Sequence, residues 1–525
     1  MKEIKENWLP HLINAVPAAG FGKRLSLYTI ALEGWRRGLK LKFFTLDDPE
    51  NKLRIRYTLS SDEREHTFES SKGDKTTDLA YKICDNKYLT KEYLQKAGVP
   101  VAEGKSFSED VSNDEIIEYA NKLGYPLVIK PISANGGKGV VSNIENQKEL
   151  EDALSYVRHE LDYSEVIVES FVQGNEFRFI VVDNEVVGVL NRVPAHIVGN
   201  GKSTIRELIR EKNEERRKNP HLKSRMIKID RTVTDLLDEL GYTLKSIPKE
   251  GEVVQLRLTS NLSTGGDSIE LTDVISPELK KIAIEGTKAI PGLTVSGMDI
   301  MVDSDNKSGV IIEANTRPGL GGHLFPVEGT PKDIPKVIVD YYFPETKDVE
   351  KSSLYFDFNS ILEPLINRTA KTVYVSPAPT GKVFGKKYIV YGKLQKVGYK
   401  VWIKRQALLH RLNGFMEDLE DGGIAIVVAS PKKEDVVNFK EICEKGNGRA
   451  KITNIIEENF DEPVKIGFEI NKTLSKEEIK ELEEDSIVLE KERDYFKKKF
   501  TQIETSRMWR YTSPVRTVLD KIKGK

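Results

Sequence analysis

The sequence predicts an α/β protein built of several domains, and three observations lead to this prediction. The chain has 525 residues, more than a single hydrophobic core usually organises, so two to four domains are expected. Between residues 125 and 345, short runs rich in β-branched residues alternate with segments of helical apolar spacing. Residues 384–470 then follow the order strand, helix, strand, strand, helix, strand, which is the ferredoxin-like pattern.

The first part of the chain predicts a small α/β domain. Two runs, "LINAVP" and "LKLKFFTL", have the composition of strands. The run "SLYTIALEGWRRG" between them has apolar residues at helical spacing and ends at Gly38. A further helix is expected at "DNKYLTKEYLQKAGVPV", because Gly98 and Pro100 are stop signals after its last turn.

The middle of the chain supplies the strands and helices of the predicted second domain. The expected strands are "YPLVIKP", "VIVESFV", "RFIVVDNEVVGVLNRVP", "VSGMDIMVDS" and "GVIIEANTRPG". The expected helices are "STIRELIREKNEERRK" and "SPELKKIAIEGTKAI". The stretch "VSPAPTGK" has the composition of a linker. We therefore expect five segments: a first domain at 1–82, a second at 83–347, a linker at 348–383, a ferredoxin-like domain at 384–470 and a charged helical tail at 471–525.

Composition narrows the function classes. A formal net charge of -1 argues against a nucleic-acid-binding protein. Two cysteines, Cys84 and Cys443, are too few for a disulfide framework or thiolate metal sites and suit a reducing compartment. The amino-terminal residues lack the apolar run of a signal peptide, and no membrane-spanning stretch is predicted. A cytoplasmic protein is expected.

The stretch "SANGGKGV" at residues 133–140 is ambiguous when taken alone. A P-loop requires a glycine where Ile132 stands and a serine or threonine where Gly139 stands. The stretch is therefore either a phosphate-binding loop of another kind or a hairpin turn without a ligand. Lys130 ends a strand just before it, from where its ammonium group would reach phosphates covered by the loop amides.

Oxygen-bearing side chains follow on later strands. Glu169 stands at a strand end, and Glu176 and Arg178 follow it, either as ligand contacts or as a simple ion pair. Glu313 and Asn315 are two residues apart on one strand, so their side chains project from the same face. Together with Asp299 they form a set of hard oxygen donors suited to Mg²⁺.

Several long runs, in this order, resemble the ATP-grasp superfamily of carboxylate–amine ligases over residues 83–347. The runs are "VPAHIVGNGKSTIRELI", "LRLTSNLSTGG", "SGMDIMV" and "IIEANTRPGLGGHLFPVEGTP". More narrowly, they are similar to the ATP-grasp modules of cyanophycin synthetases and of bifunctional glutathione-synthesising enzymes. The fold that the resemblance implies is an ATP-grasp domain preceded by a pre-ATP-grasp α/β domain.

The resemblance also implies a reaction and its residues. ATP would phosphorylate a substrate carboxylate, and an amine would displace phosphate from the acylphosphate to give an amide. The implied cofactors are ATP and Mg²⁺, with Mn²⁺ as a substitute. The implied metal ligands are Asp299, Glu313 and Asn315, and the implied catalytic residues are Arg257 and Asn261. The implied nucleotide contacts, with residues 133–140 as a phosphate lid, are Lys87, Lys130, Ser133, Gly136, Gly137, Lys138, Gly139, Glu169, Phe171, Val172 and Glu176.

Residues 384–470 resemble acylphosphatase in "YGKLQKVGYKVWIKRQA" and "LNGFMEDLEDGGIAIVV". The catalytic arginine position of that family holds Lys400, and its catalytic asparagine position holds Asp418. Lysine lacks the planar fork that binds phosphate in two places, and aspartate would repel the phosphate. We interpret this domain as a degenerate binding or scaffolding module.

The function expected from the sequence is amide-bond formation between a small-molecule, peptide or glycan carboxylate and an amino acid or other amine. The terminal run "SRMWRYTSPVRTVLDKIKGK" resembles a signature of some bacterial glycosyltransferases of surface-polysaccharide clusters. It points to a glycan pathway, whereas the ligase resemblance equally suits a peptide pathway. The charged helix before it either extends from the body of the protein without a partner, or contacts a second copy of the chain or a partner of the glycan pathway. The alternatives are an acylphosphatase-like hydrolase and a catalytically silent ATP-binding scaffold.

Overall fold

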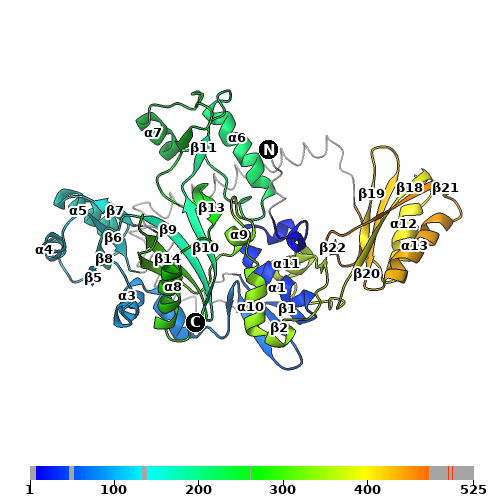
Figure 1. Cartoon of the computed structure of the whole chain (residues 1–525), viewed down its shortest axis with the longest axis horizontal. Coiled ribbons are helices and arrows are strands. Elements are labelled where there is room, and N and C mark those ends of the chain that lie inside the picture. The colour runs from blue at the N-terminus through cyan, green and yellow to red at the C-terminus, as the bar shows by residue number, and fades with distance from the viewer. Residues whose placement is uncertain are drawn as a thin grey trace.

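The computed structural model describes residues 8–46, 53–132, 139–260, 262–304 and 306–471, together with Tyr495 and Lys499. Sheets and helices are both abundant, as the α/β prediction requires, and the predicted fold class is confirmed. Figure 1 shows the sheet of β9, β10 and β14 at the centre, with β5–β8 to one side and β18–β21 at the far end. None of the helices in these described ranges is long and apolar enough to cross a membrane.

The first core forms around helix α1 (Leu25–Arg36), every residue of which is buried. A five-stranded sheet in the order β17-β1-β2-β3-β4 lies beside it. Its strands are β1 (Lys40–Leu46), β2 (Arg54–Ser60), β3 (Glu65–Glu69), β4 (Lys72–Gly73) and β17 (Thr372–Val375). Helices α10 (Ile334–Tyr342) and α11 (Phe358–Ile366) contribute to the same core. The expected strand at "LINAVP", residues 12–17, is wrong: a 3-10 helix at Pro10–Leu12 ends at its first residue, and turns follow in which Asn14 has a φ of 57°.

The segment at 348–383 differs from the expected linker. It contains β16 (Leu354–Tyr355), α11 and β17, and β17 pairs with β1 of the first sheet. Phe356 and Phe358 are fully buried in the first core. The physical reason is that burying these aromatic side chains contributes more free energy to folding than the neighbouring prolines and glycines cost.

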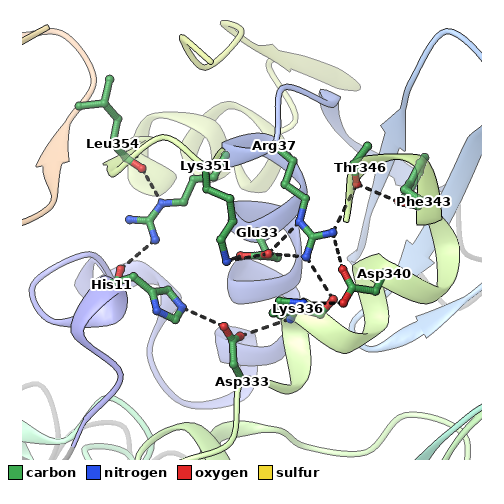
Figure 2. Close-up of polar contacts among 11 residues, drawn as sticks. His11, Glu33, Arg37, Asp333, Lys336, Asp340, Phe343, Thr346, Lys351 and Leu354 are labelled. Carbon is green, nitrogen blue, oxygen red and sulfur yellow. Dashed lines mark hydrogen bonds and ion pairs between the residues drawn. The ribbon is translucent and has the colours of Figure 1, made fainter. Parts of the chain in front are cut away.

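An ion-pair network attaches the segment at 348–383 to α1, as Figure 2 shows. The Glu33 carboxylate accepts from Arg37 Nη2 at 2.6 Å and from Lys351 Nζ at 3.0 Å. Arg37 also donates to Asp340 on α10 at 2.7 Å, so three chain segments meet at one buried group. His11 and Asp333 lie close to Glu33, but the two cations already neutralise its carboxylate.

The second body of the fold has two sheets. The smaller has the order β5-β8-β6-β7, with β5 (Gly104–Phe107), β6 (Leu127–Pro131), β7 (Val141–Ile144) and β8 (Val166–Ser170). Helices α4 (Asn113–Leu123) and α5 (Gln147–Leu154) cover its core. The larger has the order β13-β10-β9-β14-β15, with β9 (Asn175–Val182), β10 (Glu185–Val193), β13 (Asp267–Glu270), β14 (Val295–Val302) and β15 (Gly309–Asn315).

Helices α2 (Asp78–Asp85), α3 (Lys87–Lys96) and α8 (Pro277–Ala289) share one apolar core with the larger sheet. The predicted helix stop at Gly98 is confirmed, since this glycine has a φ of +72° after the last turn of α3. The short helix α9 (Gly321–Leu324) follows β15. A small outlying core combines α6 (Ile205–Lys218), α7 (Arg231–Glu239), β11 (His196–Val198) and β12 (Val253–Gln255).

The last sheet has the order β21-β18-β20-β19-β23. Its elements are β18 (Phe384–Lys393), α12 (Tyr399–Leu409), β19 (Asn413–Asp418), β20 (Ile424–Ser430), α13 (Lys433–Lys445), β21 (Lys451–Asn459) and β23 (Phe468–Ile470). The predicted order of strands and helices is therefore confirmed. Strand β22 (Val464–Lys465) pairs with β16, which joins this sheet to the first core. Apart from Asn471, Tyr495 and Lys499, the predicted tail lies outside the described residues.

Candidate active site

One pocket brings together residues that the sequence separates widely. Lys87 on α3, Lys130 on β6, Glu169 on β8 and Glu313 on β15 all line it. Two of these elements belong to the smaller sheet, one to the larger sheet, and α3 carries the fourth residue. The pocket therefore lies where the two sheets and α3 meet, and it combines cationic and anionic side chains.

A buried carboxylate holds two lysines at one end of this pocket. Lys130 Nζ lies 2.5 Å from Glu169 Oε2, and Lys91 Nζ lies 2.8 Å from Glu169 Oε1. Glu169 is 6% exposed and Lys91 is 9% exposed, so solvent screens these pairs weakly. Both oxygens of Glu169 are thus engaged within the protein, and an adenine amino group would have to share or replace one lysine.

The surroundings lower the pKa values of all three groups, Lys87, Lys91 and Glu169, but for different reasons. Burial lowers the pKa of Lys87 and that of Lys91. Burial alone would raise the pKa of Glu169, but the charges of Lys130 and Lys91 outweigh it and the net pKa is lowered. Glu169 therefore stays ionised, and the pocket keeps a lysine-rich wall suited to phosphate oxygens.

A second group of charges crosses the larger sheet in one row. Glu313 is paired across the strands with Asp299, and Asp299 with Arg178. Directly paired residues project from the same face, so the three charged side chains lie side by side. Arg178 grips Asp299 with two donors, Nε to Oδ1 and Nη2 to Oδ2, the latter at 2.5 Å.

Arg192 extends this group onto β10. It donates through Nη1 to Glu176 at 2.5 Å, and its Nη2 lies 3.5 Å from Asp299. Burial and the nearby Asp299 charge raise the pKa of Glu176. Burial would likewise raise the pKa of Asp299, but Arg178 and Arg192 outweigh it and the net pKa is lowered. Two guanidinium groups thus keep Asp299 charged on this face.

This donor set fits a divalent cation. Asp299, Glu313 and Asn315 present carboxylate and amide oxygens, the ligands that Mg²⁺ and Mn²⁺ prefer. Carboxylates gathered on a buried face need a compensating positive charge. Arg178, which donates to both oxygens of Asp299, supplies that charge in this structure.

The remaining predicted residues are placed as follows. Arg257 follows β12 and pairs with Asp230, the N-cap of α7, at 2.5 Å, while its Nε is buried without a hydrogen-bond partner. The Phe171 N–H donates to Pro126 O at 2.9 Å, and Val172 follows half-buried. Gly139 has a φ of +73°, and a Cβ there would lie 2.8 Å from Pro131 Cγ, so glycine is required. Five predicted residues lie outside the described ranges: Ser133, Gly136, Gly137, Lys138 and Asn261.

Two residues of this site were not singled out in the sequence. Lys91 follows Lys87 by four positions on α3, a spacing that places both on one helix face and would have signalled it. Arg192 carries no such signal, because its contacts with Glu176 and Asp299 depend on how three strands pair.

Comparison with known families assigns the two regions. The model "Phosphoribosylglycinamide synthetase, ATP-grasp (A) domain" matches residues 85–197, and the "RimK-like ATP-grasp domain" matches residues 232–328. The model "Acylphosphatase" matches residues 386–470. The chain carries ATP-grasp domains followed by an acylphosphatase domain.

The chain is homologous to two groups of larger enzymes. The cyanophycin synthetase of Trichormus variabilis is 40% identical over 286 residues, which make up 53% of this chain and 31% of that protein. The glutathione biosynthesis bifunctional protein of Clostridium perfringens is 34% identical over 329 residues, 61% of this chain and 41% of that protein. The chain thus spans less than half the length of these relatives.

A solved bifunctional glutathione synthetase from Pasteurella multocida is similar as well. It is 31% identical, with a TM-score of 0.45, over 55% of this chain and 41% of that chain.

The acylphosphatase domain has an internal ion pair at its altered positions. Lys400 Nζ donates to Asp418 Oδ2 at 2.7 Å, and Gln395 Nε2 donates to Asp418 Oδ1 at 3.0 Å. Burial would raise the pKa of Asp418, but these hydrogen bonds outweigh it and the net pKa is lowered. The two substituted residues therefore neutralise one another, as a lysine and an aspartate at these positions would be expected to do.

Proposed function

We propose that this protein is an ATP-dependent ligase that joins a carboxylate to an amine through an acylphosphate. The observation that carries the proposal is the pocket shared by Lys87, Lys130, Glu169 and Glu313. It brings a lysine-rich wall for phosphates next to the oxygen donors for a metal ion. Homology with cyanophycin synthetase and with the glutathione biosynthesis protein supports the same reaction class.

In this proposal the carboxylate oxygen attacks the γ-phosphorus of ATP, and ADP leaves. The amine then attacks the acyl carbon, phosphate leaves, and the amine nitrogen gives up a proton. Lys87 and Lys130 bind phosphate oxygens, and Asp299, Glu313 and Asn315 hold the divalent cation, which neutralises the phosphates when bound. Arg257 and Asn261 stabilise the charge that develops during transfer. Glu169, Glu176, Phe171 and Val172 contact the nucleoside, and Ser133, Gly136, Gly137, Lys138 and Gly139 cover its phosphates.

The substrates proposed are an amino acid or peptide carboxylate and an amino acid amine. The names of both groups of relatives favour peptide-like substrates, whereas the terminal run "SRMWRYTSPVRTVLDKIKGK" favours a carboxylated glycan. In either pathway the acylphosphatase domain serves as a binding or scaffolding module, because Lys400 and Asp418 form an ion pair with each other.

The proposal is tested by offering the purified protein ATP and Mg²⁺ with a panel of amino acids, short peptides and uronic acids, each with and without an amine. We expect phosphate release only when a matching carboxylate and amine are both present. Asp299→Asn and Glu313→Gln should abolish it. ATP binding without phosphate release from any pair would instead support a silent scaffold.

A further inference from the structure

Arg178 occupies a particular position on the larger sheet. It lies opposite Asp299 on β14 and opposite Leu190 on β10, in the middle of the sheet. Its two contacts to Asp299 leave that carboxylate, which is 2% exposed, fully paired. A guanidinium group is therefore bound to the acidic residue that the proposed function requires for a metal ion.

Gly297 makes this arrangement sterically feasible. It stands two residues before Asp299 on β14, so a side chain there would project from the same face. A Cβ at Gly297 would lie 3.2 Å from Arg178 Cδ and 3.6 Å from its Nε. Any larger side chain would compete with the guanidinium for this space. The glycine thus leaves room for the Arg178 side chain beside β14, where Pro318 Cβ also lies 3.0 Å from the position of an added Cβ.

We propose that Arg178 is a resident counter-ion that holds Asp299 in the metal-free state, yields this carboxylate to the divalent cation, and then binds the transferring phosphoryl group. The second half of this inference rests on the proposed function, whereas the competition at Asp299 does not. The ligand class for the released guanidinium is a phosphoryl oxygen pair, which the planar arginine fork matches in geometry.

Two further points support this role. A guanidinium group is not deprotonated in proteins, so Arg178 keeps its positive charge when it leaves Asp299. Arg192 stays within 3.5 Å of Asp299 and is anchored by Glu176. One arginine therefore remains to compensate the acidic face when the other moves, which limits the cost of releasing Arg178.

The test is the affinity for Mn²⁺ in the absence of nucleotide, measured by electron paramagnetic resonance or calorimetry on the full chain. Arg178→Met removes the competing cation. We expect this variant to bind Mn²⁺ at least about tenfold more tightly than the wild type does. Arg178→Lys keeps the charge but cannot donate two hydrogen bonds to Asp299 in the same way. Its Mn²⁺ affinity should lie between those of the wild type and Arg178→Met. Asp299→Asn should lose the site.

Arg64→Met is the control for the loss of an arginine charge, because Arg64 forms more exposed ion pairs, with Glu63 and Glu345 at 3.3 Å, in another part of the chain. It should leave Mn²⁺ affinity unchanged. If Arg178→Met fails to fold, Arg178→Lys and the paired variant Arg178→Met with Asp299→Asn still report on competition and on folding. Equal or weaker Mn²⁺ binding by a folded Arg178→Met or Arg178→Lys protein would overturn the inference.

The same variant separates this inference from the proposed function. In the ligase assay Arg178→Met should lose at least about a hundredfold in turnover while binding the metal better, because a transition-state contact is gone. Suppose that Arg178→Met binds Mn²⁺ more tightly but the wild type turns over no substrate pair. This result would support competition between Arg178 and the cation for Asp299, and it would refute the proposed ligase function. Undiminished turnover in this variant would refute the phosphoryl contact.

Discussion

Lys130 and Glu169 form a buried ion pair between neighbouring strands, with Nζ and Oε2 2.5 Å apart. Lys91 takes the other oxygen of the same carboxylate at 2.8 Å. This triad joins α3 to the smaller sheet and fixes Lys130 at the wall of the pocket. Glu169 therefore has a role in positioning two lysines besides the nucleoside contact proposed for it.

Replacing Glu169 with glutamine should lower stability. The change leaves two neighbouring lysines without their common anion, and breaking a buried pair in this way typically costs about 3 kcal/mol. Urea denaturation measures the loss. Glu118→Gln is the control, because its pair with Lys122 is exposed on both sides and should contribute little to stability. Equal losses in the two variants would contradict the buried role of Glu169.

The same pair predicts a pH dependence. The pKa of Glu169 is lower in the folded protein than the ordinary value of about 4.3. Its contribution to stability is therefore fully present above that ordinary value and is lost as the pH falls through the folded pKa. The stability difference between wild type and Glu169→Gln should stay constant from about pH 6 to 8 and shrink below about pH 4. A difference that grows on acidification would have the wrong sign.

Lys87 should contribute to nucleotide binding. Loss of one charge-assisted contact to phosphate weakens binding by about tenfold, which we expect for Lys87→Met with a non-hydrolysable ATP analogue and Mg²⁺. Calorimetry gives the dissociation constant. Lys96→Met is matched to it, since Lys96 lies on the same helix in an exposed pair with Glu92. A similar loss in both variants would indicate a general charge effect in place of a site contact.

The extent to which the sequence predicts this site follows from the range of each contact. Glu313 and Asn315 lie on one strand, so their common face was predictable from a period of two. The end of the helix that carries Lys87 was predictable from its stop signals, Gly98 and Pro100. The hydrogen bonds from Arg178 to Asp299 were not predictable, because they depend on the register of strands far apart in the chain. The failed linker prediction has a related cause, since Phe356 and Phe358 are buried by distant partners.

The acylphosphatase domain should be inactive as it stands. Asp418 accepts from Lys400 and Gln395 where the family would bind a phosphate group. We expect no hydrolysis of benzoyl phosphate by the wild type, and measurable hydrolysis after the combined change Lys400→Arg and Asp418→Asn. Asp418→Asn alone is the intermediate control, because it removes the internal anion without restoring the fork. Hydrolysis by the wild type that disappears in Lys400→Ala would reverse this assignment.

Glu33 should be important for attaching the segment at 348–383 to α1. It is 3% exposed and accepts from both Arg37 and Lys351. Glu33→Gln leaves these cations poorly compensated and should cost about 3 kcal/mol of unfolding free energy. Glu63→Gln, which alters an exposed pair with Arg64 in the same part of the chain, should change it by less than about 0.5 kcal/mol. Thermal unfolding of both variants decides whether the network stabilises the fold.

In the proposed reaction a substrate carboxylate becomes phosphorylated. The most direct measurement uses the best substrate pair from the panel with ¹⁸O in the carboxylate, and mass spectrometry of the phosphate released. The acylphosphate route predicts one ¹⁸O atom in each phosphate, dependence on Mg²⁺, and loss of the signal in Asp299→Asn. Phosphate that carries no ¹⁸O, or release that continues undiminished in Asp299→Asn, would contradict it.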